Sequence, residues 1–341
     1  MDEPALYNGT RFHVSVLPIL DRDGAHSRVV IVKATYDLAR GEPLQLAEEQ
    51  REPRLGDEMW GSPEIADVRL PGDFCASKPG TDFVLSSHAI APDASGSATF
   101  VDVAIQVADR ARTLRVHGAR NWRSSLMGVV PGPSAAMVPT PLAWSRAYGG
   151  VDLSDPRHPL EEARNPAGTG VVRDSKLLIG TPAPQIEAVD EPIGNAGTRM
   201  APAGCAALAP NYEPRRSKAG TYDSRWLRDG YPARPADYDP AHENCAAPGW
   251  HFDKPLRGGE LVRLSGVSAM GRLEFSLPKL AVLVEAEIDG QLTERRPHLD
   301  TVVVDGDALV LEFAWRGLFR CPTKMRHRFT AIRVRAKEFV G

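Results

Sequence analysis

The sequence predicts a mainly β protein with two antiparallel, sandwich-like β-lobes, bridged by a long Pro-rich segment that is irregular but ordered. Runs of Val, Ile, Thr and aromatic residues alternate with polar residues in the first and last thirds, and turn residues separate these runs. In contrast, 18 of the 29 prolines lie between positions 126 and 255, where they would interrupt regular elements. We therefore expect an N-terminal β-lobe at 1–125, a bridging segment at 126–258 and a C-terminal β-lobe at 259–341, packed as one unit.

The N-terminal lobe begins with a predicted hairpin. Residues 12–16 alternate apolar and polar side chains, Asp21 to Gly24 supply turn chemistry, and residues 28–38 continue as a second strand. Further strands are expected at 82–90, 99–107 and 113–122.

The C-terminal lobe repeats this pattern with shorter runs. Asp289-Gly290 and Asp305-Gly306 each lie between strand-like runs, and both pairs suit the positive φ angles of two-residue hairpin turns. The expected strands are 260–264, 272–277, 281–288, 291–295, 301–304, 309–315 and 330–335.

The bridging segment is too rich in aromatic residues for a disordered linker. Either it wraps over the two lobes as ordered loops, or it presents aromatic surface to another protein, and the two interpretations are compatible. Short helical turns are expected at 160–164 and 224–229. The aromatic residues are Trp144, Tyr148, Tyr212, Tyr222, Trp226, Tyr231, Tyr238 and Trp250.

Composition limits the classes of partner. With 341 residues and a formal net charge of -3, the whole chain gives no sign of a nucleic-acid or membrane partner. The start of the chain is acidic and polar, and no long apolar run follows, so we expect a cytoplasmic protein.

The four cysteines lie far apart without a Cys-x-x-Cys pair and indicate reduced thiols. The oligomeric state is left open.

Motifs of catalysis are few. The chain lacks Gly-x-Ser-x-Gly, His-Glu-x-x-His and a P-loop, and the Gly-rich residues 165–170 fit a rigid turn better than a phosphate cradle. Asp300, Asp305 and Asp307 could suggest a calcium loop or paired carboxylates, but their spacing favours a plain hairpin. We expect no catalytic residue, no metal site and no cofactor.

Basic residues accumulate near the C-terminus. They could form a solvated face or dock to an acidic protein surface, whereas sparse aromatic residues disfavour nucleic-acid binding. The residues are Arg316, Arg320, Lys324, Arg326, His327, Arg328, Arg333 and Arg335.

A series of short phrases in fixed order carries a family resemblance. It comprises Lys78-Pro79-Gly80-Thr81-Asp82, His117-Gly118-Ala119-Arg120-Asn121-Trp122, Arg146-Ala147-Tyr148-Gly149-Gly150, Asn165-Pro166-Ala167-Gly168-Thr169-Gly170 and Ala219-Gly220-Thr221-Tyr222-Asp223 followed by Trp226. The set resembles, over nearly the whole chain, the type VI secretion accessory proteins of domain of unknown function 2169.

The resemblance implies a non-enzymatic adaptor or chaperone that binds a toxin effector and helps load it onto a VgrG or PAAR-repeat spike protein. An alternative is a carbohydrate-active β-sandwich hydrolase or lyase, with two carboxylates in a groove. A structural component of the secretion apparatus is a third class. The family-signature residues are candidates for partner contact or for turns and internal ties. They are Lys78, Pro79, Asp82, Gly118, Arg120, Trp122, Arg146, Tyr148, Gly149, Gly150, Asn165, Pro166, Gly168, Gly170, Gly220, Thr221, Tyr222, Asp223 and Trp226.

Overall fold

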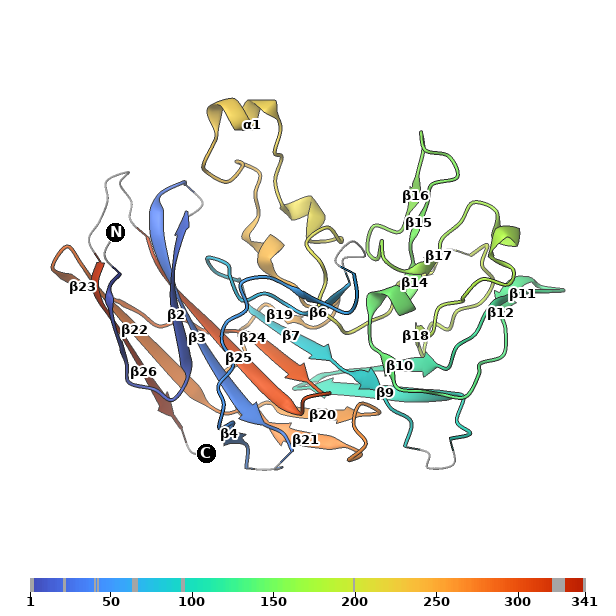
Figure 1. Cartoon of the computed structure of the whole chain (residues 1–341), viewed down its shortest axis with the longest axis horizontal. Helices are drawn as coiled ribbons and strands as arrows, with labels where there is room; N and C mark the ends of the chain where they lie inside the picture. Colours follow the sequence, from blue (N-terminus) through green and yellow to red (C-terminus); the bar gives the residue numbers. More distant parts are fainter. Residues whose placement is uncertain are drawn as a thin grey trace.

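The computed structural model describes residues 3–20, 23–39, 41, 43–62, 67–92, 96–198, 200–320 and 329–339. Three larger β-sheets dominate this part of the chain, and helical structure is limited to α1 and short 3-10 turns. The prediction of a mainly β protein is thus confirmed. In Figure 1 the larger sheets lie along the lower part of the molecule, and the bridging segment rises from them to α1.

The largest sheet has seven strands. Strands β24 and β7 pair in parallel, and all other neighbouring strands of this sheet pair antiparallel. Strand β2 lies at one edge, and β4 is an additional partner of β3. The strand order is β19 (His251–Phe252), β7 (Thr81–Ser86), β24 (Leu299–Asp305), β25 (Val310–Phe319), β3 (His26–Asp37) and β2 (His13–Leu20), with β4 (Gln45–Leu46) beside β3.

Two smaller sheets complete the larger β structure. The five-stranded sheet has the order β18 (Ile186–Ala188), β10 (Arg110–His117), β9 (Phe100–Val107), β20 (Leu261–Ser265) and β21 (Leu273–Ser276). The four-stranded sheet has the order β1 (Ala5–Asn8), β26 (Phe329–Glu338), β22 (Leu280–Ile288) and β23 (Gln291–Arg295).

The expected lobes at 1–125 and 259–341 do not form separate sheets. Each of the three large sheets contains strands from both segments, for example where β24 and β25 lie between β7 and β3. The boundaries therefore mark stretches of sequence, not structural units. A two-residue period indicates that a segment is a strand, but it does not indicate which distant strand becomes its neighbour.

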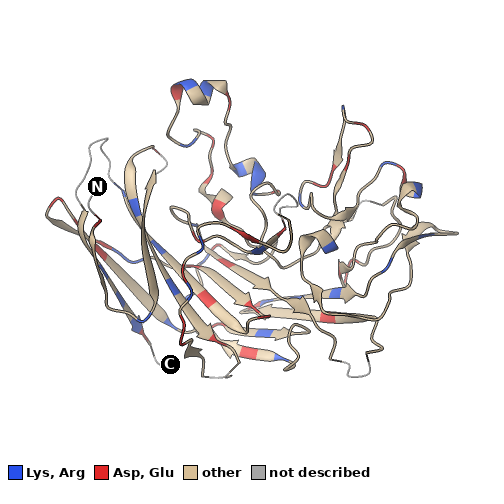
Figure 2. Cartoon of the chain, viewed as in Figure 1, with Lys and Arg blue, Asp and Glu red and all other residues tan. Residues whose placement is uncertain are grey.

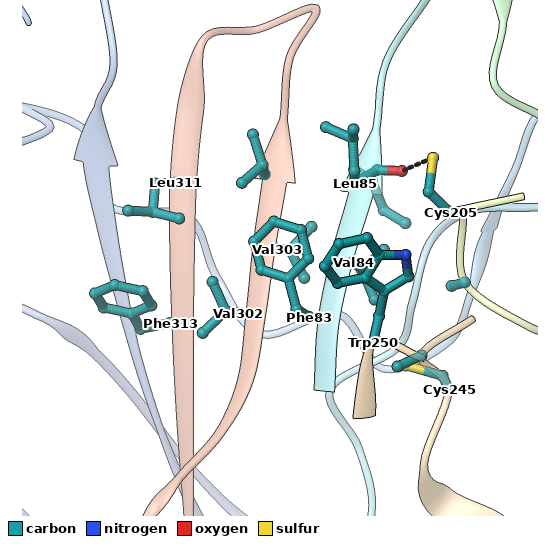
Figure 3. Packing of buried hydrophobic residues seen from close by; sticks show 14 of the residues in the cluster. Phe83, Val84, Leu85, Cys205, Cys245, Trp250, Val302, Val303, Leu311 and Phe313 are labelled. Atoms are coloured by element: carbon teal, nitrogen blue, oxygen red, sulfur yellow. Dashed lines mark hydrogen bonds between the residues drawn. The ribbon is translucent and has the colours of Figure 1, made fainter. Parts of the chain in front are cut away.

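Both faces of the seven-stranded sheet are buried. Along β25, Leu311 and Phe313 point to the apolar side, where Phe83 of β7 lies 5.8 Å from the Trp250 ring (Figure 3). The residue between them, Glu312, lies on the opposite side, which carries buried charged groups. The apolar side forms part of the main core.

Outside the three large sheets, the described part of the chain, including most of the bridging segment, is built from short strand pairs and turns. The strand pairs are β5 (Glu58–Met59) with β6 (Val68–Leu70), β8 (His88–Ala89) with β13 (Thr140–Pro141), β11 (Trp122–Ser125) with β12 (Gly128–Pro131), β14 (Tyr148–Gly149) with β17 (Thr169–Gly170), and β15 (Val151–Asp152) with β16 (Leu160–Glu161). The helical elements are η2 (Trp144–Arg146), η3 (Ser175–Leu178), η4 (Arg216–Lys218), α1 (Ser224–Asp229) and η5 (Pro240–Glu243).

Ring burial explains how this proline-rich segment is ordered. Trp144, Tyr212 and Trp250 belong to the main hydrophobic core, whereas Tyr222 and Tyr231 are exposed. The segment therefore wraps over the sheets with some of its rings, as one of the two interpretations expected, and leaves others at the surface.

Local predictions have mixed outcomes. The helix expected at 224–229 is confirmed as α1, but residues 160–164 contain strand β16 instead of a helical turn. Asp289 and Gly290 form the expected two-residue turn, with φ angles of 50° and 80°. Asp305 is the last residue of β24, and positions 306–309 separate it from β25, so the two-residue turn expected at Asp305-Gly306 is wrong.

Candidate functional site

Residues 219–239, here called the arm, project from the bridging segment with α1 near their end (Figure 1). The base of the arm is closed by Asp237, which accepts hydrogen bonds from the Thr221 backbone nitrogen and hydroxyl at 3.0 and 2.7 Å. Helix α1 starts because the Asp223 carboxylate caps it, accepting from the Trp226 backbone nitrogen at 2.7 Å, and it ends at Gly230.

An aromatic cluster holds the arm together. The Trp226 ring lies edge-on to Tyr222 and Tyr231, with ring centroids 4.7 and 6.0 Å away. The Trp226 indole nitrogen donates to the Ala233 carbonyl at 2.9 Å. Tyr222 and Tyr231 nevertheless remain 49% and 68% exposed, and α1 has no buried residue. The arm is therefore stabilised mainly by its own rings.

A cavity of about 610 Å³ lies between the arm and the end of β2, with residues 55–57, 71–72 and 74 completing the opposite wall. We call this cavity and its walls the cleft. Exposed large apolar side chains from four separate parts of the chain converge there, which makes it the candidate binding surface. They are Leu20, Leu55, Phe74, Tyr222 and Tyr231.

Lys78, Cys75 and Cys245 line the floor of the cleft. The Lys78 ammonium lies 3.1 Å from Asp82 and 3.3 Å from the Cys245 sulfur, and His251 binds Asp82 at 2.9 Å. Burial alone would raise the pKa of Asp82, but the Lys78 charge and the His251 hydrogen bond outweigh it and lower that pKa to about 2. This buried charge pair is thus compensated within the protein.

The floor thiols are weak nucleophiles. Burial raises the pKa of the Cys75 and Cys245 thiols to about 11, so both carry their protons at neutral pH.

Charged groups in the walls of the cleft are also engaged with the protein. Arg234 donates to the Tyr222 hydroxyl at 3.1 Å and lies 3.7 Å from Glu243. Glu243 accepts from the Tyr238 hydroxyl at 2.8 Å, and Asp57 accepts from the Gly72 backbone nitrogen at 2.7 Å. An occupant of the cleft does not need to supply balancing charge for these groups.

The structure brings two groups of signature residues to the cleft. The first group is at the floor, where Lys78 lines the cleft and pairs with the buried Asp82, and Pro79 follows Lys78 in the chain. The second group lies on the arm, where Tyr222 and Trp226 line the cleft. Gly220, Thr221 and Asp223 shape the arm: a Cβ on Gly220, whose φ is 83°, would lie 2.9 Å from the Pro235 side chain. These residues combine structural roles with a place at the candidate site.

The other signature residues lie outside the cleft lining and have packing roles. Arg120 pairs with Glu187 at 2.9 Å, and Trp122 is buried in a second, smaller core. Arg146 donates to the Gln185 side chain at 3.0 Å, and Asn165 donates to the carbonyls of Trp144 and Tyr148. Backbone atoms pack closely against Gly118, Gly149, Gly150 and Gly168, and the rings of Tyr148 and Trp122 pack against Gly170. Pro166 and Tyr148 complete this group.

Sequence reasoning missed the wall opposite the arm. Leu20 ends a strand, whereas Leu55 and Phe74 lie in irregular segments, and each resembles an ordinary core residue in the sequence. Only the tertiary structure brings them together, so no local signal could have identified them.

The predicted basic surface near the C-terminus is wrong at Arg316. Its side chain is fully buried and pairs with Asp300, because β25 directs it to the charged side of the seven-stranded sheet. Arg333 and Arg335 pair with Glu287 and Glu285 on β22. Lys324, Arg326, His327 and Arg328 lie outside the described residues. Figure 2 shows acidic and basic residues interspersed along the sheets.

Within the described ranges, no group of three or more His, Cys, Asp or Glu residues is placed to hold a metal ion, and no helix is long and apolar enough to cross a membrane. The fold and the cleft define a mainly β protein with an aromatic-walled concave surface. A family model described as an uncharacterized protein conserved in bacteria (DUF2169) matches residues 23–316, and the chain belongs to this family. No curated protein and no solved structure matches the chain.

Proposed function

We propose that this protein is a non-enzymatic adaptor or chaperone in the cytoplasm, which binds a type VI secretion effector and helps load it onto a VgrG or PAAR-repeat spike protein. The effector and spike partners are those that the family resemblance implies. The observation that carries the binding role is the convergence of Leu20, Leu55, Phe74, Tyr222 and Tyr231 on one cleft. We assign the cleft to a segment of the partner polypeptide.

The cleft has the physical properties of a protein-binding surface. Trp and Tyr side chains provide much of the binding free energy at protein interfaces, and here the rings are already fixed against one another. A preformed surface loses less conformational entropy on binding. A volume of about 610 Å³ has room for several apolar side chains of a partner.

The carbohydrate-active alternative receives less support from the same residues. Glycoside hydrolysis uses two carboxyl groups that reach the sugar from a groove. Asp57 and Glu243 line the cleft, but each accepts a hydrogen bond from the protein itself. This engagement favours a binding role for the cleft.

Replacing Tyr222 and Tyr231 together with Ala should weaken capture of the effector and spike proteins by at least about 2 kcal/mol, the loss typical of interface hot spots. The fold should persist, since both rings are exposed and pack within the arm. The measurement is affinity capture from the native bacterium with quantitative mass spectrometry, beside thermal unfolding.

The matched control is Tyr7→Ala, because Tyr7 is 58% exposed on β1 and does not line the cleft. This variant should capture the same proteins as the unmodified chain. Equal capture by the double variant and by Tyr7→Ala, with both proteins folded, would remove the cleft from the proposed function.

A further inference from the structure

The arm forms one wall of the cleft and meets the opposite wall near the turn between β2 and β3. A Cβ built on Gly24 in this turn would lie 3.2 Å from the Ala233 backbone nitrogen and 3.5 Å from the Pro232 side chain. Pro232 and Ala233 both line the cleft. The arm therefore closes against the β2–β3 hairpin in this structure.

Closure leaves the floor of the cleft poorly accessible. Cys75 and Cys245 both line the cavity, yet they are only 7% and 2% exposed, and Lys78 beside them is also buried. A partner segment that contacts these floor residues needs the arm to move away from the β2–β3 hairpin.

One ion pair, Arg234 with Glu243 at 3.7 Å, joins the moving part of the arm to η5, and few other interactions oppose its movement. In the described part of the chain, no hydrogen bond joins residues 221–233 to β2 or to residues 55–75, and the backbone bonds of α1 and of the turn after it stay within the arm. The rings of Tyr222, Trp226 and Tyr231 pack on one another, so they can move as one body. Segments with few outside contacts open at low free energy.

The base of the arm supplies a defined pivot. Gly220 has a φ of 83° there, and Asp239 donates its backbone nitrogen to the Lys218 carbonyl at 3.0 Å. We propose that the arm is a lid, which rotates about residues 218–221 and 237–239 to admit a partner segment to the cleft. The lid rests on the proposed function, because it regulates access to the same binding site.

The floor cysteines allow a test that needs no partner. Brief labelling of the whole protein with N-ethylmaleimide, followed by peptide mass spectrometry, measures the modification rate of each cysteine. Opening of the arm should expose Cys75 and Cys245 but not Cys205, which is buried in the main core and does not line the cleft. Cys205 thus reports unfolding of the whole molecule.

The test variant is Gly24→Leu, whose side chain would push against Ala233. The matched control is Gly41→Leu: Gly24 and Gly41 have φ angles of 76° and 73°, but a Cβ on Gly41 meets nothing within 4 Å. Both substitutions impose similar backbone strain, and only the first displaces the arm.

Labelling of Cys75 and Cys245 should be roughly three- to tenfold faster in Gly24→Leu than in Gly41→Leu, with the Cys205 rate equal in both, because weakening one closing contact shifts a local opening equilibrium. Equal rates at the floor cysteines in the two variants would overturn the lid. So would a common rate for all three cysteines in the unmodified protein, because labelling would then follow global unfolding. Either result leaves the capture experiment on Tyr222 and Tyr231 as a separate test of the binding role.

Discussion

Two sequence motifs of the family signature, residues 146–150 and 165–170, pack closely against each other at Asn165. Its side-chain nitrogen donates to the carbonyls of Trp144 and Tyr148 at 2.8 and 2.9 Å, and the residue is fully buried. A Cβ on Gly149 would lie 2.2 Å from the Asn165 carbonyl oxygen, and one on Gly168 would lie 2.7 Å from the Gly149 Cα. Gly at both positions is thus a steric requirement of this packing, which makes the two phrases one structural unit.

Asn165→Ala should lower the free energy of unfolding by about 2 to 3 kcal/mol, since it removes two buried hydrogen bonds to backbone carbonyls. Urea unfolding followed by tryptophan fluorescence measures this change. The exposed Asn121 of another signature phrase gives the control, and Asn121→Ala should change stability by less than about 0.5 kcal/mol. Equal effects of the two substitutions would contradict the packing role.

A secondary-structure element can be predicted from the sequence when the residues that determine it lie within the element or beside it. Helix α1 follows from an Asp cap and a closing Gly, and the Asp289-Gly290 turn follows from its own backbone preferences. Strand β16 could not be foreseen, because a strand of two residues has no periodicity of its own, and pairing with β15 decides the outcome.

Asp223→Ala should loosen α1 without destabilising the molecule. Loss of the cap costs about 1 kcal/mol, so amide hydrogen exchange in residues 224–230 should rise roughly fivefold. The thermal midpoint should stay constant, since α1 has no buried residue. Asp239→Ala is a control, because Asp239 caps η5 in the same way and should leave exchange in α1 unchanged. A lowered thermal midpoint for Asp223→Ala would show that the arm contributes to global stability.

For the whole molecule, the sequence supports the strand content but not the assembly. Runs rich in β-branched and aromatic residues identify β3, β7 and β25 as strands, yet their order in one sheet depends on contacts between distant segments. The cleft has the same limitation, because its walls come from four parts of the chain. The aromatic wall formed by the arm could be predicted, because one of the two interpretations of the bridging segment was that it presents aromatic surface to another protein.

The charged side of the seven-stranded sheet is another property of the assembled molecule. Glu312 is buried, with its carboxylate 3.0 Å from Lys33, 2.6 Å from Arg54 and 2.9 Å from Arg51. Burial alone would raise the pKa of Glu312, but hydrogen bonding from Arg54 and the charges of Lys33 and Arg54 lower it to about 2. The pKa values of Asp82 and Glu187 are also lowered to about 2 by their basic partners, against the effect of burial.

These depressed pKa values predict loss of stability in acid. Between about pH 5 and pH 2 the unfolded chain binds more protons at these carboxylates than the folded chain does, so the free energy of unfolding falls as the pH falls. Glu312→Gln should lower stability at pH 7 by about 3 to 5 kcal/mol, because it leaves buried cations without their counterion, and should make the decline below pH 5 shallower. Urea unfolding across this pH range measures both effects. Glu49 is exposed, so the Glu49→Gln variant should show the same decline of the free energy of unfolding below pH 5 as the unmodified protein. An equally steep decline in Glu312→Gln would show that Glu312 does not couple folding to pH.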